Sequence, residues 1–187
     1  MVLSKLMICL TGMPGAGKST VVSALKEDGY FALTLGDGVR AEAKKRNLEP
    51  SGQNLGKIML ELREKNGAGA IALLLVDQIT NAEDNIIIID GVRSNAEIDV
   101  LKKIGIVKLL AITASQETRF NFLKARGRSD DPDTAEKFNE RDNRELGIGI
   151  SDSIDASDEK ILNNGLTINE LTESAKTIIQ KWKNENT

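Results

Sequence analysis

The 187-residue chain contains no histidine, one cysteine and only 3% aromatic residues. Without histidine, neither imidazole acid–base chemistry nor histidine metal ligation is available. The single Cys9 lies in an apolar segment and is predicted to be a core residue in a reducing compartment. The few aromatic side chains and the net charge of −3 argue against a nucleic-acid-binding surface.

Long hydrophobic runs are also missing. The longest apolar run, residues 68–76, is far too short to cross a bilayer. Near the N-terminus, Lys5 interrupts a short apolar segment, so no signal peptide is predicted. We therefore expect a cytoplasmic protein without a membrane partner. Its length and its 40% hydrophobic residues suit one globular domain, residues 1–187, with a hydrophobic core.

What the chain does contain is a phosphate-binding motif, Gly12-Met13-Pro14-Gly15-Ala16-Gly17-Lys18-Ser19, followed by Thr20. It has the Walker A pattern of two glycines that flank four free positions, and then Lys-Ser. Glycine lets the backbone bend around an anion, so that successive N–H groups point at phosphate oxygens. A helix that begins near Gly17 adds its positive N-terminal end. Lys18 is predicted to bridge the β- and γ-phosphates, and the Ser19 hydroxyl to ligate Mg²⁺.

The segments on both sides of the motif provide the context that it requires. Residues 4–11 form a short apolar run, typical of a buried parallel strand. Residues 20–28 form an amphipathic helix that ends at Gly29. The alternative is a glycine-rich turn that binds nothing, and the order strand, loop, helix argues against it.

The clearest strand is residues 86–90, four isoleucines followed by Asp90, and its β-branched residues predict burial on both faces. An acid at the carboxyl end of a central strand faces the ligand crevice of an open α/β sheet. Asp90 is therefore predicted to support Mg²⁺ or its waters. The alternative is that Asp90 only caps the next helix, which Ser94 or Asn95 could do instead. Arg93 lies just beyond the strand end and is predicted to reach an acceptor phosphate rather than remain a surface arginine.

A second pair of candidates follows a predicted strand over residues 30–34. Asp37 is a plausible N-cap for a helix that continues over residues 41–47, which would place Arg40 in the first helical turn. A cation at a helix N-terminus gains nothing from the macrodipole. We therefore predict that Arg40 binds an anion, and a solvated arginine is the alternative.

The remaining segments complete an alternating α/β pattern. Helices within residues 35–80 form an insertion over the sheet edge, where an acceptor could sit, and residues 147–157 are a loose connection. Five strands that alternate with helices predict one three-layer α/β domain with a parallel sheet. The further predicted helices cover residues 54–65, 70–79, 96–104, 116–124, 134–146 and 168–182, and the further strands cover residues 106–113 and 158–162.

Residues 126–146 are predicted to form a lid region. Residues 126–133 are polar and broken by glycine and proline, so they should be mobile. Phosphoryl transfer needs cations around the transferring group and exclusion of water, and a closing lid provides both. Local ion pairing with neighbouring acids such as Glu145 is the alternative for each cation. The candidates are Arg119, Arg126 and Arg128, and then Arg141 and Arg144 on one face of the next helix.

These motifs resemble those of nucleoside monophosphate kinases and dephospho-coenzyme A kinases, and above all those of archaeal adenylate-kinase-related proteins. Residues 12–19 resemble the adenylate kinase nucleotide loop. Residues 36–40, Gly-Asp-Gly-Val-Arg, resemble its Gly-Asp-x-x-Arg segment, whose arginine binds the acceptor phosphate. Residues 90–93, Asp-Gly-Val-Arg, resemble Asp-Gly-Phe-Pro-Arg, one residue shorter and without the proline. Residues 161–165 are similar to the end of dephospho-coenzyme A kinases, where the turn, here at Asn163, borders the donor adenine.

The resemblance implies a P-loop kinase sheet of order 2-3-1-4-5 and transfer of the γ-phosphoryl group of ATP·Mg²⁺ to a small acceptor. The favoured acceptor is a nucleoside monophosphate. The lid lacks zinc-type cysteines and a long β-insert, and the spacing from Asp37 to Arg40 follows adenylate kinases. The predicted roles are donor binding by Gly12, Pro14, Gly15, Ala16, Gly17, Lys18, Ser19, Thr20 and Asn163, metal binding by Ser19 and Asp90, acceptor binding by Asp37, Arg40, Arg93 and Arg144, and catalysis by Lys18, Asp37, Arg93, Arg126, Arg128 and Arg141.

Two other functions stay open at this point. A phosphate acceptor needs no base, whereas transfer to a hydroxyl, as in dephospho-coenzyme A kinases, benefits from a carboxylate such as Asp37. A nucleotide-dependent switch would need the loop and Asp90 but no acceptor site. The presence of two candidate acceptor-binding arginines, Arg40 and Arg93, counts against a switch. A kinase directed at nucleic acid is weaker still, because net charge and aromatic content oppose it.

Overall fold

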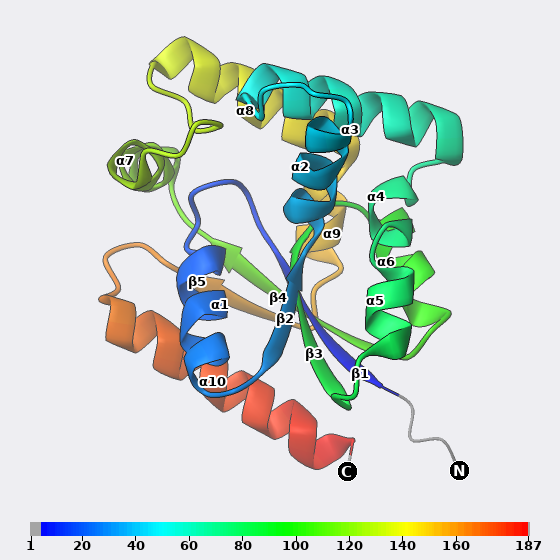
Figure 1. The fold of residues 1–187 in the computed structure, drawn as a ribbon. Helices are drawn as coiled ribbons and strands as arrows, with labels where there is room; N and C mark the ends of the chain where they lie inside the picture. Colours follow the sequence, from blue (N-terminus) through cyan, green and yellow to red (C-terminus); the bar gives the residue numbers. More distant parts are fainter. Residues whose placement is uncertain (1–4, 187) are drawn as a thin grey trace.

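The computed structural model describes residues 5–186, which form a parallel sheet between two layers of helices (Figure 1). The strands run in the order β2-β3-β1-β4-β5, and every neighbouring pair is parallel. The three-layer α/β fold and the strand order are therefore confirmed. The strands are β1 (Leu6–Thr11), β2 (Phe31–Thr34), β3 (Ile86–Val92), β4 (Ile106–Thr113) and β5 (Glu159–Leu162). Ser4, the expected start of the first strand, lies outside the described residues.

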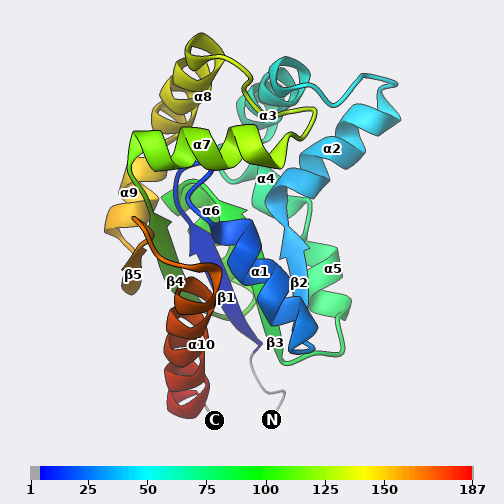
Figure 2. The same cartoon turned by 90° about the vertical axis from the view of Figure 1, so that its left-hand side faces the viewer.

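Most of the predicted helices are present, with bounds that differ by a few residues. Helices α1 and α10 cover one face of the sheet, and α2, α3, α7 and α8 stand over the carboxyl ends of the strands (Figure 2). The helices are α1 (Lys18–Glu27), α2 (Leu35–Lys45), α3 (Gly52–Asn66), α4 (Ala70–Leu73), α5 (Val76–Asn81), α6 (Asn95–Lys102), α7 (Gln116–Arg126), α8 (Ala135–Ile148), α9 (Ile150–Asp155) and α10 (Ile168–Glu185).

Two hydrophobic cores flank the central strand β1, because successive side chains point to opposite faces. Met7 and Cys9 pack against α2 to α6, whereas Ile8 and Leu10 pack against α1 and α10. All four side chains are fully buried. Complete burial of one such aliphatic side chain is worth about 2 kcal/mol. Both cores together hold β1 and β3 in the middle of the sheet, and the chain crosses over β1 between β3 and β4, so a ligand crevice is expected at their carboxyl ends.

The predicted start of the second helix is wrong. Helix α2 begins at Leu35, directly after β2, and Thr34 is its N-cap residue. Asp37 is therefore in the first turn rather than at the N-cap, and Arg40 is in the second turn. Leu35 and Val39 are buried in the core, and this packing outweighs the low helix propensity of the neighbouring glycines.

Two other local predictions are wrong for a similar reason. The single helix expected over residues 70–79 is divided into α4 and α5, because a turn near Leu75 lets the apolar residues of both pieces reach the core. The loose connection expected over residues 147–157 is largely helical, as the end of α8 and α9. There Ser153 is fully buried, and its hydroxyl lies 2.8 Å from that of Thr11 in β1. Tertiary contacts of this kind are not visible in a polar sequence.

Candidate active site

The phosphate-binding loop joins the end of β1 to the start of α1. Gly12, Gly15 and Gly17 have φ angles of 135°, 83° and 109°, in a region that favours glycine. A Cβ at Gly12 would lie 2.0 Å from the carbonyl oxygen of Ile112, and one at Gly15 would lie 2.5 Å from that of Arg119. These glycines are thus required both by backbone conformation and by the close approach of neighbouring backbone.

Two side chains donate hydrogen bonds to backbone carbonyl groups of the loop. The Nδ2 of Asn163 donates to the carbonyl oxygen of Ala16 at 3.0 Å. Arg119 donates to the carbonyl oxygen of Pro14 at 3.2 Å and forms a buried ion pair with Asp142 of α8. Arg119 is therefore occupied with supporting the loop, and it does not line the cavity described below. Ala16 is completely buried and does not line the cavity.

Lys18 folds back over the loop. Its amine donates to the carbonyl oxygens of Gly12 and Met13, the second at 3.1 Å. Burial lowers the pKa of Lys18 from 10.5 to about 8, against the opposing effect of the Asp90 carboxylate. Bound phosphates would favour the charged amine in the same way that Asp90 does. The ammonium group thus lies where a triphosphate would need a cation.

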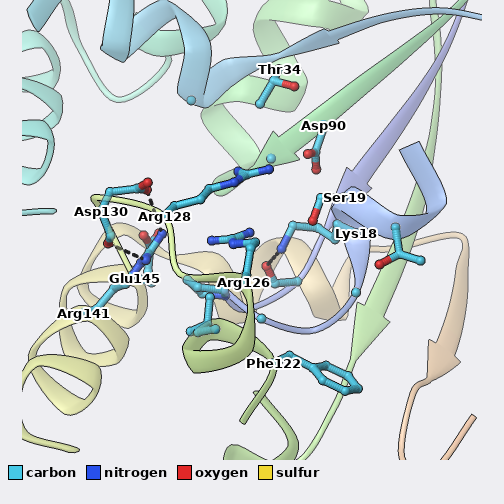
Figure 3. A pocket seen from close by; sticks show the side chains of 18 of the residues that line it. Lys18, Ser19, Thr34, Asp90, Phe122, Arg126, Arg128, Asp130, Arg141 and Glu145 are labelled. Carbon is cyan, nitrogen blue, oxygen red and sulfur yellow. Dashed lines mark hydrogen bonds and ion pairs between the residues drawn. The ribbon is translucent and has the colours of Figure 1, made fainter. Parts of the chain in front are cut away.

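Asp90 lies at the carboxyl end of β3, next to the loop (Figure 3). Its Oδ1 is buried without a hydrogen-bond partner in the described part of the chain, and burial raises the pKa of its carboxyl group. An orphaned carboxylate oxygen beside the Ser19 hydroxyl fits Mg²⁺, which prefers oxygen ligands. Residues 5–186 contain no group of three or more acidic or thiol side chains able to hold a metal alone.

A cavity of about 460 Å³ extends from the loop towards α2, α3 and α8. This volume lies within the usual range for small-molecule sites of roughly 300–1,000 Å³. Figure 3 shows cationic side chains from several elements converging on it. The predicted residues that line it are Gly12, Pro14, Gly15, Gly17, Lys18, Ser19, Thr20, Arg40, Asp90, Arg93, Arg126, Arg128, Arg141, Arg144 and Asn163.

The acceptor-side arginines are held by carboxylates. The Nε of Arg93 lies 2.9 Å from Oε2 of Glu145, a buried residue of α8. Arg40 forms ion pairs with Asp37 of its own helix at 2.9 Å and with Asp130 of the lid at 3.0 Å. The pairs thus link the end of β3 to α8, and α2 to the lid.

The lid arginines are also paired, but with acids of the lid itself. The Nε of Arg126 donates to Asp131 at 2.8 Å, and Arg141 contacts both Asp130 and Asp131. Arg128 forms no ion pair with any described residue, although it lines the cavity. The ion-pairing alternative therefore holds for Arg126 and Arg141, although their partners are Asp130 and Asp131 of the lid rather than helical neighbours such as Glu145.

Arg144 has a different environment. Its guanidinium lies against Gly56 of α3, where a Cβ would come within 2.8 Å of Nη1. Its Nε is buried and has no hydrogen-bond partner among residues 5–186. The absence of a side chain at position 56 is what leaves room for this planar group.

Asp37 does not line the main cavity. It lies in an adjoining recess that Ser19, Thr34 and Asp90 also line, and its side chain is 69% exposed. If Asp37 has the predicted roles in acceptor binding and catalysis, it acts from the rim of the cavity by pairing with Arg40.

Three further residues belong to the site but were not among the sequence candidates. Asp130 and Glu145 supply carboxylates to the cavity, and Phe122, 44% exposed, also lines it. Acids near several arginines were visible in the sequence, but which arginine each one meets was not.

Glu97 is a buried residue that sequence reasoning missed. It accepts the backbone N–H of Arg93 at 2.7 Å and the guanidinium of Arg63 at 2.6 Å. It therefore fixes the segment between Asp90 and Arg93. No local signal marks it, because an acid in the first turn of α6 looks like an ordinary helix-start residue.

Comparisons with known proteins identify the family and the fold. A family model described as an AAA domain matches residues 11–139. A UPF0200 protein of Hyperthermus butylicus is 37% identical over 177 residues, which cover 95% of both chains.

Among solved structures, shikimate kinase from Acinetobacter baumannii, in complex with shikimate, has a TM-score of 0.60 at 17% identity and covers 97% of this chain and 96% of its own. Thymidylate kinase from Candida albicans has a TM-score of 0.59 at 17% identity, with 98% and 93% covered. At such identity the likeness shows the fold alone, which is that of P-loop kinases. None of the helices within residues 5–186 is long and apolar enough to cross a membrane.

Proposed function

Since this chain belongs to the AAA-domain and UPF0200 families and has a P-loop kinase fold, we propose that it transfers the γ-phosphoryl group of ATP to a small acceptor. The favoured acceptor is a nucleoside monophosphate. The observation that carries this proposal is a single cavity that joins the phosphate-binding loop to arginines of α2, α8, the lid and the end of β3. A protein that only binds a nucleotide needs the loop but not this second set of cations.

The donor end binds and orients ATP. Loop amides and the Lys18 ammonium hold its phosphates, and Ser19 and Asp90 would hold Mg²⁺, which neutralises charge on the phosphates when bound. Arg126 and Arg128 lie beside the loop and stabilise charge on the transferring group. Phe122 and Asn163 border the space for the donor base.

The acceptor end favours a phosphate over a hydroxyl compound. Cationic side chains outnumber carboxylates along the cavity, so it suits two polyanionic ligands. Transfer to a hydroxyl would benefit from a base in reach of the acceptor. Asp37, the candidate base, is exposed, paired with Arg40 and outside the main cavity. Arg40, Arg93 and Arg144 would instead hold a phosphate that is already nucleophilic.

Product analysis tests the proposal directly. The protein is incubated with ATP·Mg²⁺ and each of AMP, CMP, GMP, UMP, dephospho-coenzyme A and shikimate, and the products are identified by mass. We expect a nucleoside diphosphate from at least one monophosphate, and none from the Lys18→Ala variant. Lys181→Ala, an exposed lysine that pairs with Glu159, is the matched control and should keep the activity.

Three outcomes would contradict parts of this function. If the main product is a phosphorylated hydroxyl compound, the acceptor is a hydroxyl compound and not a nucleoside monophosphate. Tight ATP binding with no transfer to any acceptor would indicate a nucleotide-dependent switch. Full activity of Lys18→Ala would show that the site is elsewhere.

A further inference from the structure

The lid places a carboxylate of its own at the acceptor end of the cavity. Asp130 lies in the loop between α7 and α8, and its Oδ2 is 3.0 Å from Nη2 of Arg40 and 3.5 Å from Nη2 of Arg141. Its side chain is only 7% exposed and lines the cavity, where Figure 3 shows it beside Arg141. A carboxylate between two guanidinium groups occupies the kind of place that a phosphate takes.

Further contacts hold the loop in this position. Arg141 also donates to the carbonyl oxygen of Asp130 at 2.9 Å. The hydroxyl of Ser129 donates to the carbonyl oxygen of Pro50 at 3.4 Å. A Cβ at Gly52, the first residue of α3, would lie 3.2 Å from the Asp130 carbonyl oxygen. The loop thus spans from α8 to the start of α3 and closes over Arg40.

The other groups of the two arginines are occupied as well. Nη1 of Arg40 lies 2.9 Å from Asp37, and Nη1 of Arg141 lies 3.3 Å from Asp131. Neither guanidinium can therefore take a second anion through both of its ends unless a carboxylate leaves. Asp131 does not line the main cavity and Asp37 lies at the rim, so Asp130 is the carboxylate that an incoming phosphate meets.

We propose that Asp130 is an intramolecular stand-in for the acceptor phosphate, which must displace it from Arg40 and Arg141 before transfer. Breaking these buried pairs costs free energy, whichever anion enters. A dianionic phosphate monoester recovers more of this cost than a monoanion does, because its attraction to the same two cations is larger. Because this cost is common to all anions, Asp130 weakens the binding of each by the same factor, so that only an anion that pairs strongly with both cations displaces it. The inference rests on the proposed function only for naming the acceptor.

Anion binding tests the inference without any turnover. Mg²⁺ and a non-hydrolysable ATP analogue occupy the donor end, and AMP, CMP and inorganic phosphate are then titrated by calorimetry. We expect Asp130→Asn to bind at least one of these phosphates about tenfold more tightly than the unmodified protein, since the competing charge is gone. Asp130→Glu, which keeps the charge, should restore weak binding.

Asp133→Asn is the matched control. Asp133 lies in the same loop, is exposed, and pairs with Lys137 at 2.8 Å, so its loss should leave phosphate binding unchanged. If a folded Asp130→Asn protein binds phosphates more weakly or equally, Asp130 positions the arginines instead, and the inference is overturned.

A structure of the unmodified protein decides the question if Asp130→Asn does not fold. With the ATP analogue and AMP bound, the Asp130 carboxylate should be beyond hydrogen-bond distance of both arginines. A carboxylate that still pairs with Arg40 and Arg141 beside the bound acceptor would refute displacement.

The two proposals fail in different experiments. A protein that phosphorylates nothing would refute the kinase function, while tighter phosphate binding by Asp130→Asn would still support the stand-in. A working kinase whose Asp130→Asn variant binds no phosphate more tightly would do the reverse.

Discussion

The donor and acceptor ends of the cavity are held together in different ways. At the donor end, glycines with positive φ angles approach neighbouring backbone to within van der Waals limits, and Asn163 and Arg119 hold two of the loop carbonyl groups. At the acceptor end, ion pairs between side chains connect elements far apart in the chain, such as Arg93 with Glu145. Backbone geometry fixes a loop in one conformation, whereas ion pairs between side chains can exchange a carboxylate for another anion. Under the proposed function, this difference suits a donor held by a fixed loop and an acceptor that displaces a carboxylate.

The largest effect is expected where the donor end tolerates no side chain. Gly12→Ala should lower the free energy of unfolding by about 3 kcal/mol or more, because the new Cβ would collide with the carbonyl oxygen of Ile112. Gly29→Ala is the control: its φ is also positive, at 86°, but nothing among residues 5–186 lies within 4 Å of a Cβ there. Its cost should be only about 1–2 kcal/mol. Urea unfolding measures both, and equal losses would show that close approach at Gly12 matters little.

A smaller effect is expected from an acceptor-side arginine. Arg40→Gln should weaken binding of the accepted monophosphate about tenfold, since a charge-assisted hydrogen bond is lost. Binding of ATP should change less, because Arg40 pairs with Asp37 and Asp130 rather than with the phosphate-binding loop. Arg46→Gln on the same helix, whose arginine pairs with Glu42 and Glu61 away from the cavity, is the control. Equal weakening of ATP and acceptor binding by Arg40→Gln would show that the cavity does not have separate donor and acceptor ends.

The smallest effect is a change in proton balance at Lys18. Because burial lowers its pKa to about 8, ligand-free protein at that pH holds this proton only half of the time. Phosphates favour the charged amine, so ATP binding at pH 8 should take up about half a proton, and almost none at pH 6. Calorimetry in buffers of different ionisation enthalpy measures this uptake, which Lys18→Met should abolish. Uptake that persists in this variant would assign the proton to another group.

The lowered pKa of Lys18 also predicts the direction in which the free energy of unfolding changes with pH. Between pH 8 and 10.5 the unfolded chain holds more of this proton than the folded chain does. The contribution of Lys18 to the free energy of unfolding therefore rises as pH increases through this window.

Most of the fold followed from patterns that are local in the sequence. The four isoleucines before Asp90 and the apolar run before Gly12 each predict a strand buried on both faces, and both are central in the sheet. The errors occur where local propensity and burial disagree. Gly36 and Gly38 argue against a helix, yet α2 starts before them because Leu35 and Val39 reach the core.

The candidate site divides in the same way. Except for Asn163, the predicted donor residues are contiguous, so one motif identifies the phosphate-binding loop, and the prediction for Asp90 follows from its place at a strand end. Arg40 and Arg93 were visible as cations near predicted strand ends. Their partners Asp130 and Glu145, and the support that Glu97 gives, depend on helices that meet only in three dimensions.

The sequence by itself determined the class of the protein: a parallel α/β sheet, a loop that binds phosphate, and cations enough for two anionic ligands. Those features depend on steric and hydrogen-bonding requirements of residues that are neighbours in the sequence, so short segments are enough to predict them. Only the tertiary structure decided which carboxylate meets which arginine, that Arg119 supports the loop, and that Asp130 occupies the acceptor end. Coulomb interactions depend on distance in space, and Arg40 and Asp130, 90 positions apart, come within hydrogen-bond reach only when the helices pack.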